Sequence, residues 1–239
     1  MSLREIRERL ARAAILLDYD GTLAPIVGRP EDARPAPGAA DVLAGLLDRA
    51  GSVSVVTGRP AAFVRAALPV DGLDVVGLYG MEGAPAVPDD VRGQIETAIA
   101  GEPGAHLEDK RASIAVHVRA APDPVAAAER LGPELARIAA AHGLALLHGK
   151  RVMEVAPAGG GKGSAVRAIL DAGRPEAALY AGDDLADLAA FAALDVAAEH
   201  GAAVTRVAVL GPETPDDLVA VADVMVEGPE GLLDLLRDL

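Results

Sequence analysis

The sequence predicts an α/β fold: a doubly wound, Rossmann-like parallel sheet with a smaller α/β cap domain inserted into it. Short apolar segments alternate with helical segments in the first and last thirds of the chain, as in parallel sheets covered on both faces. Between these parts the strands alternate in polarity, which is typical of an antiparallel sheet. We therefore expect a core formed by residues 1–84 and 157–239, and an inserted cap at residues 85–156.

The elements of the expected core follow in chain order. A buried strand at 13–18 precedes a helix at 38–50, and a second strand is expected at 52–57. Pro60 begins the next helix, because proline is favoured at a first helical position. A third strand completes this half at 73–78. The second half is expected to contain a helix at about 162–172, a strand at 177–181, a helix at about 185–193, short strands near 195–197 and 206–210, and a terminal helix at 232–239.

The inserted part is expected to form helix, two strands, helix and two strands. In the strand at 113–119, apolar residues alternate with Ser113, Ala115, His117 and Arg119, so one face would be buried and the other available for contacts. A later strand would carry His148, Lys150 and Glu154 on one face if it continued without a bulge.

Composition excludes several classes of protein. The 239 residues are enough for a large core, and the apolar content of 51% excludes a disordered chain. The absence of cysteine excludes disulfides, zinc–thiolate sites and cysteine nucleophiles. A net charge of −14 argues against nucleic acid or an anionic membrane as a partner. Without a long apolar run or a signal segment, a soluble, cytoplasmic protein is expected.

Two carboxylates follow the first predicted strand, in Asp18-Tyr19-Asp20-Gly21-Thr22. Ligands of open α/β sheets bind beyond the carboxyl ends of the strands. One aspartate there could act as a nucleophile that forms an acyl phosphate, and the other as acid and base. On spacing alone, a loop in which Asp and Gly serve turn geometry is the better explanation.

Two basic segments lie where a helix begins. Thr57-Gly58-Arg59 offers a hydroxyl and exposed amides that suit an anion, although an ordinary helix cap by Thr57 explains it equally well. Lys162 follows three glycines, but Gly163 separates it from Ser164, so the P-loop pattern fails. The ammonium could still meet a phosphoryl oxygen. Lys162 is one of only three lysines among 22 basic residues, so a compact ammonium could be required there.

Three further carboxylates, Asp183, Asp184 and Asp187, follow a later strand. Carboxylates gathered at a strand end are costly without a cation, and Mg²⁺ favours a few carboxylates, water and a phosphate oxygen. Taken together, the segments DYDGT, TGR, Lys162 and GDD-x-x-D resemble the four motifs of the haloacid dehalogenase (HAD) superfamily of phosphatases. The insertion between the second and third motifs is similar to the α/β, C2-type cap of that superfamily.

The resemblance implies a magnesium-dependent phosphatase and a role for each matching residue. Asp18 would attack phosphorus and bind Mg²⁺, together with Asp183 and the main-chain carbonyl of Asp20. Asp20 would protonate the leaving alkoxide and then activate water against the aspartyl-phosphate. Thr57 and Lys162 would hold the phosphoryl oxygens and neutralise their charge.

The resemblance also implies supporting residues around this centre. Thr22 would orient the nucleophile or the phosphate. Asp184 and Asp187 would act through water or through hydrogen bonds to the metal ligands. Gly58 and Arg59 would contact the substrate.

The inserted part resembles the trehalose-6-phosphate phosphatase family in the segments LEDKRASIAVHVR (107–119) and GKRVMEVAP (149–157). In that family such segments contact glucose rings, and carboxylates, an ammonium, an imidazole and a hydroxyl together suit a polyol. A solvated cap face would fit the polar pattern as well. The substrate-binding residues implied by the family segments and the shared strand face are Glu108, Lys110, Ser113, His117, Arg119, Lys150 and Glu154.

These resemblances imply hydrolysis of trehalose 6-phosphate to trehalose and inorganic phosphate. Tyr79, Ala186 and Leu188 depart from residues common in the family, which leaves room for sucrose phosphate, mannosyl-phosphoglycerate or a pseudo-disaccharide phosphate. A phosphomutase is a further alternative. A non-catalytic sugar-phosphate sensor would typically lack Asp18, Asp20 or Lys162, all of which are present. A small-molecule sugar phosphate is the expected partner, and a monomer would suffice.

Overall fold

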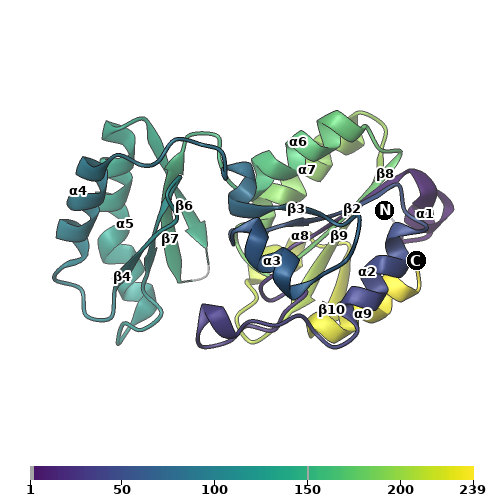
Figure 1. Cartoon of the computed structure of the whole chain (residues 1–239), viewed down its shortest axis with the longest axis horizontal. Coiled ribbons are helices and arrows are strands. Elements are labelled where there is room, and N and C mark those ends of the chain that lie inside the picture. The colour runs from purple at the N-terminus through teal and green to yellow at the C-terminus, as the bar shows by residue number, and fades with distance from the viewer. Residues whose placement is uncertain (1–2, 150) are drawn as a thin grey trace. The chain divides into compact units, whose positions relative to one another are not determined.

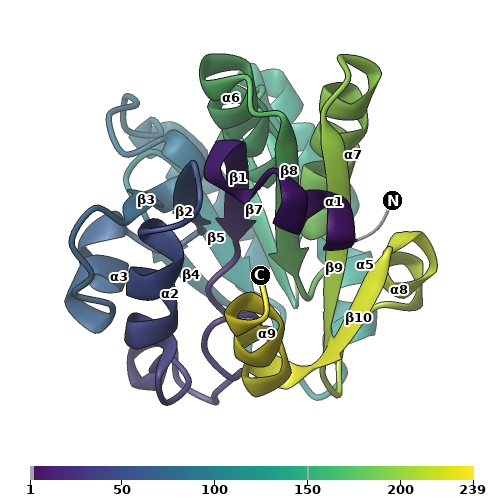
Figure 2. The same cartoon turned by 90° about the vertical axis from the view of Figure 1, so that its right-hand side faces the viewer.

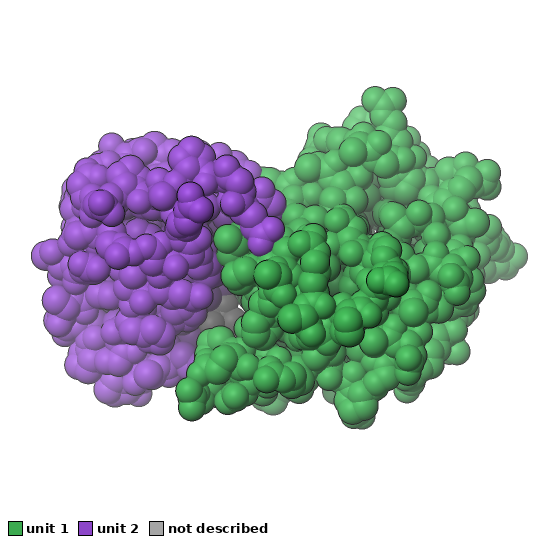
Figure 3. Space-filling view, in the orientation of Figure 1, with its two compact units in different colours: residues 1–79, 162–239 green, residues 80–161 purple. Residues whose placement is uncertain are grey.

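The structure is a computed structural model that describes residues 3–149 and 151–239. It divides into two compact units, residues 1–79 with 162–239 and residues 80–161, which Figure 3 shows in green and purple. The inserted unit is longer at both ends than the range 85–156 expected from the sequence. No helix within the described ranges combines the length and apolar character needed to cross a bilayer.

The first unit is built on a six-stranded parallel sheet with the order β10-β9-β8-β1-β2-β3 (Figures 1 and 2). The chain runs outward from β1 to β3 and then returns to the other side of β1, so the strand order reverses between β1 and β8. In doubly wound sheets, ligands bind at the carboxyl ends of the strands beside such a reversal. The strands are β1 (Ala13–Leu17), β2 (Ser52–Val56), β3 (Asp74–Val76), β8 (Ala177–Gly182), β9 (Ala203–Leu210) and β10 (Val224–Glu227).

Helices cover both faces of this sheet. Ile15 and Leu17 of β1 pack in a core shared with α1, α2, α3 and α9, whereas Leu16 packs in a second core with α6, α7 and α8. Because both faces are covered, every residue of β1 is buried, which explains its continuous apolar sequence. The helices are α1 (Leu3–Glu8), α2 (Ala39–Leu47), α3 (Ala61–Ala67), α6 (Lys162–Gly173), α7 (Asp187–Glu199), α8 (Asp216–Val221) and α9 (Gly228–Arg237), with short 3-10 turns η1 (Leu10–Arg12), η2 (Pro30–Asp32) and η3 (Gly77–Gly80).

The second unit contains a four-stranded antiparallel sheet with the order β4-β5-β7-β6. Val116 and Val155 pack against α4 and α5, so these helices cover one face of the sheet. Residues that alternate with them, including Ala115 and Glu154, lie on the other face, which we call the open face. The elements are α4 (Asp89–Ile99), β4 (His106–Asp109), β5 (Ile114–His117), α5 (Pro124–Ala141), β6 (Leu144–Gly149) and β7 (Val152–Pro157).

The predicted short strand near residues 195–197 is wrong. These residues lie inside α7, whose sequence is rich in alanine, the residue with the strongest helix propensity. Phe191 and Leu194 of this helix are buried against the sheet. A short apolar stretch there could be read as either element, and the tertiary packing favours the helix.

The predicted placement of His148 and Glu154 on one strand face is also wrong. The chain turns between them, because β6 ends at Gly149 and β7 begins at Val152. His148 is opposite Met153, on the face covered by helices, whereas Glu154 lies on the open face. Lys150 lies outside the described residues.

Candidate active site

Asp18 and Asp183 lie at the reversal point of the parallel sheet, at the carboxyl ends of β1 and β8. The amide of Asp18 donates to the carbonyl of Ala181 at 2.9 Å, which ties the loop after β1 to the neighbouring strand. One oxygen each of Asp18, Asp183 and Asp187 lies within 4.8 Å of the others, and all three side chains are buried. The fold therefore gathers three carboxylates where a ligand is expected.

Gly21 allows the loop after β1 to approach this cluster. Its φ of +80° is in the left-handed region, which favours glycine. A Cβ at this position would lie 2.1 Å from Oδ2 of Asp183, so any side chain would displace that carboxylate. The amide of Gly21 donates to the carbonyl of Ala24 at 2.7 Å and closes the turn.

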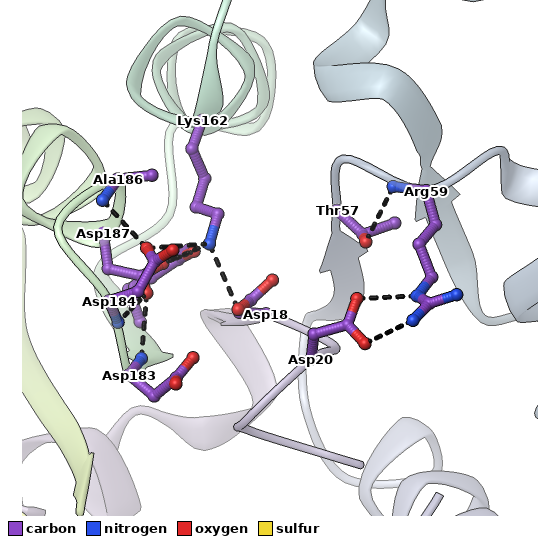
Figure 4. A network of polar contacts seen from close by, with 10 residues as sticks. Asp18, Asp20, Thr57, Arg59, Lys162, Asp183, Asp184, Ala186 and Asp187 are labelled. Carbon is purple, nitrogen blue, oxygen red and sulfur yellow. Dashed lines mark hydrogen bonds and ion pairs between the residues drawn. The ribbon is translucent and has the colours of Figure 1, made fainter. Parts of the chain in front are cut away.

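Lys162, the first residue of α6, extends its ammonium among the carboxylates (Figure 4). Its Nζ lies 3.1 Å from Oδ2 of Asp18, 2.6 Å from Oδ1 of Asp187 and 3.9 Å from Oδ1 of Asp184. Burial alone would lower the pKa of Lys162, but Asp18 and Asp187 outweigh it and raise the pKa well above its usual value. The ammonium is therefore held charged beside Asp18.

Both oxygens of Asp187 are occupied by hydrogen bonds. Oδ1 accepts from Lys162 and from the hydroxyl of Tyr180, each at 2.6 Å. Oδ2 accepts from the amides of Asp183 and Asp184 at 2.8 and 2.9 Å. Asp187 thus fixes the turn after β8, and it is poorly suited to bind a cation even though it belongs to the cluster.

Asp18 and Asp183 are therefore the carboxylates best able to hold a metal ion. Burial raises the pKa of Asp18 well above its usual value, Lys162 opposes this effect, and the neighbouring carboxylates add to it. Burial also raises the pKa of Asp184. Three carboxylates (Asp18, Asp184 and Asp187) lie within 3.9 Å of one ammonium, and Asp183 lies beside Asp18 and Asp187, so a divalent cation would offset the excess negative charge.

Asp20 turns away from Lys162 and pairs with Arg59 (Figure 4). Nε and Nη2 of Arg59 donate to its two carboxylate oxygens at 2.6 and 2.7 Å. This is the bidentate geometry in which Arg–carboxylate hydrogen bonds are strongest. The structure thus brings Arg59, predicted as a substrate-binding residue, onto the predicted acid and base.

The segment after β2 borders the same sheet edge. Thr57 is buried, and its Oγ1 accepts from the amide of Arg59 at 3.1 Å. A Cβ at Gly58 would lie 2.7 Å from the hydroxyl oxygen of Tyr79, so a side chain there would require that ring to move. In the loop after β1, Thr22 is fully buried, and its Oγ1 has no hydrogen-bond partner among the residues that the structure describes.

In the second unit, most of the predicted substrate-binding residues belong to two hydrogen-bonded groups. Nζ of Lys110 lies 3.2 Å from Oε2 of Glu154, and the hydroxyl of Ser113 donates to the same carboxylate. On the neighbouring strands, Nε2 of His117 lies 2.7 Å from Oε2 of Glu108. The open face therefore presents acidic, basic and hydroxyl groups together. Arg119 follows β5 and is half-buried.

Two residues of these clusters were missed by the sequence analysis. Tyr180 donates to Asp187, and its hydroxyl in an otherwise apolar buried strand was the available signal. His106 stacks on His117, with 4.8 Å between ring centroids. Its position two residues before Glu108 places both on the open face, which the strand period could have indicated.

Comparison with known proteins identifies the family. A family model described as trehalose-phosphatase matches residues 16–86 and 84–217, which is most of the chain. The chain belongs to the trehalose-phosphatase family. Its parallel-sheet core with an inserted cap is the fold of HAD-superfamily phosphatases, as predicted from the sequence.

Two curated relatives that match the chain are longer than it. A trehalose-phosphate phosphatase of Mycobacterium tuberculosis is 31% identical over 212 residues, which are 79% of this chain and 52% of the relative. An uncharacterized glycosyl hydrolase of the same species is 34% identical over 206 residues, which are 77% of this chain and 15% of the relative. The chain thus spans at most about half the length of these relatives.

Solved structures similar to this trehalose-phosphatase family chain share its fold. The C-terminal domain of a trehalose-6-phosphate phosphatase from C. albicans has a TM-score of 0.79 at 24% identity, covering 96% of this chain and 92% of that one. A HAD-superfamily phosphatase from Bacteroides thetaiotaomicron has a TM-score of 0.64 at 19% identity, covering 94% of each chain. The C-terminal domain of a trehalose synthase regulatory protein from Candida albicans has a TM-score of 0.69 at 12% identity, covering 95% and 93%.

Proposed function

We propose that this chain is a magnesium-dependent phosphatase that hydrolyses a sugar phosphate monoester, trehalose 6-phosphate, to trehalose and inorganic phosphate. The observation that carries the proposal is the buried Asp18, beside Asp183 and 3.1 Å from the ammonium of Lys162. This arrangement suits an aspartate that attacks a phosphoryl group whose charge is neutralised nearby. Membership of the trehalose-phosphatase family supports the choice of substrate.

In the proposed reaction, a carboxylate oxygen of Asp18 bonds to phosphorus while the bond from phosphorus to the sugar oxygen breaks. Asp20 gives its proton to that sugar oxygen. It later takes a proton from the water that attacks phosphorus, while the bond from phosphorus to Asp18 breaks and inorganic phosphate leaves. Lys162 holds a phosphoryl oxygen by charge. The hydroxyl of Thr57 and the amide of Gly58 bind another, because exposed amides after a strand suit anions.

The groups suited to hold Mg²⁺ are the carboxylates of Asp18 and Asp183 and the main-chain carbonyl of Asp20. The bound ion would neutralise charge on the phosphoryl oxygens. Asp187 keeps the turn after β8 in place, and Asp184 acts through water. Thr22 has a buried hydroxyl that could orient Asp18 or the phosphate.

We assign the sugar-binding role to the open face of the second unit. The contacts Lys110–Glu154 and His117–Glu108 support this assignment, because they align groups that can exchange partners for sugar hydroxyls. Ser113 donates to Glu154 on this face, and we assign Arg119 to the same role. Lys150, the remaining predicted sugar-binding residue, lies outside the described residues.

A non-catalytic sugar-phosphate sensor is the competing function. The likeness to a regulatory protein means that the fold alone does not separate enzyme from sensor. Asp18, Asp20 and Lys162 favour the enzyme, since a sensor has no need of a nucleophile, an acid and a buried ammonium at one sheet edge.

A screen for phosphate release tests the proposed function. Trehalose 6-phosphate, sucrose phosphate, mannosyl-phosphoglycerate and glucose 6-phosphate are each incubated with the full chain, with Mg²⁺ or with excess EDTA. We expect the fastest release from trehalose 6-phosphate and none with EDTA. Release from glucose 6-phosphate at an equal rate would reject a disaccharide substrate, and binding without release from any ester would identify a sensor.

A further inference from the structure

Arg59 is held by protein groups on three sides. Besides its two hydrogen bonds to Asp20, it donates from Nη1 to the carbonyl of Pro30 at 2.7 Å. The guanidinium carbon lies 4.4 Å from the centroid of the Phe63 ring and 5.7 Å from that of Tyr19. Only 15% of the side chain is exposed. A planar guanidinium fixed by a carboxylate, a carbonyl and a ring has little freedom to follow a mobile ligand.

The hydrogen bonds from Arg59 define where the carboxylate of Asp20 lies. Two parallel hydrogen bonds from one guanidinium fix the rotation of a carboxylate as well as its position. Figure 4 shows the carboxylate of Asp20 turned toward Arg59, while that of Asp18 is turned toward Lys162. The side chain of Asp20 is 35% exposed, so it would be free to change rotamer in solvent if the pair were absent.

We propose that Arg59 is a positioning residue that acts through Asp20 and does not bind the substrate. The inference rests on the proposed function, in which Asp20 gives a proton to the leaving sugar oxygen and later accepts one from water. Arg59 keeps the carboxylate in one place between these two proton transfers. This assignment replaces the substrate contact that the Thr57-Gly58-Arg59 segment suggests from sequence.

The decisive measurement separates the two half-reactions. With p-nitrophenyl phosphate the leaving group departs without protonation, so the initial burst of nitrophenolate reports attack by Asp18 alone. Steady-state turnover also requires water activation by Asp20. For Arg59→Gln we expect a burst rate within about threefold of the wild type. The steady-state rate should be lower by roughly 10–100-fold, because misplacing Asp20 would lose part of the rate enhancement that acid–base catalysis usually provides. Arg59→Lys keeps the positive charge but cannot make two parallel hydrogen bonds to one carboxylate. Its steady-state rate should therefore lie between those of the wild type and Arg59→Gln.

A double-mutant cycle shows whether Arg59 acts through Asp20. If it does, Arg59→Gln combined with Asp20→Asn should be no slower than Asp20→Asn alone. The matched control is Arg65→Gln, because Arg65 of α3 donates to the carbonyl of Val75 at 3.2 Å and has no place in the proposed reaction. Its burst and steady-state rates should equal those of the wild type.

Two kinetic outcomes would overturn the inference: losses that add in the double variant, or a burst that falls as much as the steady state. Either would mean that Arg59 acts on the substrate directly. The same three variants can be compared by thermal melting, which requires no turnover. The change in Tm of the double variant should differ from the sum of the changes in the two single variants. A wild-type chain that releases no phosphate would overturn the proposed function and the catalytic role of Arg59, while melting would still report the pair itself.

Discussion

Asp18 and Asp20 are two residues apart, but their surroundings differ. Asp18 is enclosed by Lys162 and other carboxylates, and burial raises its pKa. Asp20 is partly exposed and is bound by Arg59. At the scale of single residues, the ammonium of Lys162 favours the charged form of Asp18 and so supports its proposed role in attack, whereas the exposure of Asp20 supports its proposed role in proton transfer.

Substitution by asparagine should separate these two roles. Asp18→Asn removes the nucleophile, so neither a burst nor turnover should be detected with p-nitrophenyl phosphate. Asp20→Asn should still give a burst and then stall with phosphate on Asp18, which mass spectrometry of the acid-quenched protein would detect. Near-normal activity of Asp18→Asn would refute its assignment as nucleophile.

Thr205 offers a test of stability at the same scale. Its side chain is buried among apolar residues of β9, and Oγ1 has no partner within the described part of the chain. Thr205→Val removes the unpaired hydroxyl, so the free energy of unfolding in urea should rise by about 1 kcal/mol. Thr205→Ser keeps the hydroxyl and loses a methyl group, and should be destabilising. A loss of stability in the valine variant would show that a buried water satisfies the hydroxyl.

At the scale of elements, strand β7 carries the central acid of the open face. Glu154 accepts from Lys110 and Ser113, so in the proposed complex its truncation would leave sugar hydroxyls unpaired. Glu154→Ala should lower kcat/KM for trehalose 6-phosphate by about 10–100-fold, which corresponds to roughly 1–3 kcal/mol. Activity on p-nitrophenyl phosphate should change little.

Glu134→Ala is the matched control for this prediction. Glu134 lies on α5 of the same unit and pairs with Arg137 at an exposed position, so its loss should affect neither substrate. Equal losses on both substrates for Glu154→Ala would assign that residue to the stability of the unit instead of to sugar binding.

The elements that the sequence predicted best are those whose burial is uniform. The apolar runs of β1, β2 and β8 identify parallel strands covered on both faces, and their shared edge explains why Asp18 and Asp183 meet. The hairpin that separates His148 from Glu154 could not be recognised from polarity alone, because both segments alternate. The edge strand β10 was missed, since its residues alternate between half-buried and exposed and lack the uniform burial of the central strands.

Contacts that depend on side-chain rotamers were beyond sequence analysis. Motif spacing brings Lys162 and Asp187 to one edge of the sheet. It does not show that Asp187 also accepts from Tyr180 and from two amides. The pairing of Arg59 with Asp20 depends in the same way on how two loops pack.

At the scale of the whole molecule, charge predicts how metal removal affects stability. The chain carries a net charge of −14, and the site gathers carboxylates around one ammonium. Mg²⁺ that binds only the folded state should raise Tm, by an amount equivalent to about 2.7 kcal/mol at 100 times its Kd. Differential scanning fluorimetry with MgCl₂, against NaCl at matched ionic strength, measures this shift.

Asp183→Asn should remove most of that magnesium shift. The variant has one repulsive charge fewer, so in EDTA it should melt at or above the wild-type temperature. An undiminished shift would mean that the cation binds elsewhere on the acidic surface.

The pairing of β1 with β8 has a consequence for how the protein is made. Leu17 lies beside Ala181, so β1 cannot pair on this side until β8, more than 150 residues later in the sequence, has been synthesised. The described strands of the inserted unit pair only with one another and have their own core, so this unit is expected to fold while synthesis continues. A chain interrupted before residue 177 would leave one edge of β1, with Ile15 and Leu16, unpaired and apolar. Such fragments are expected to aggregate, even though their inserted unit is intact.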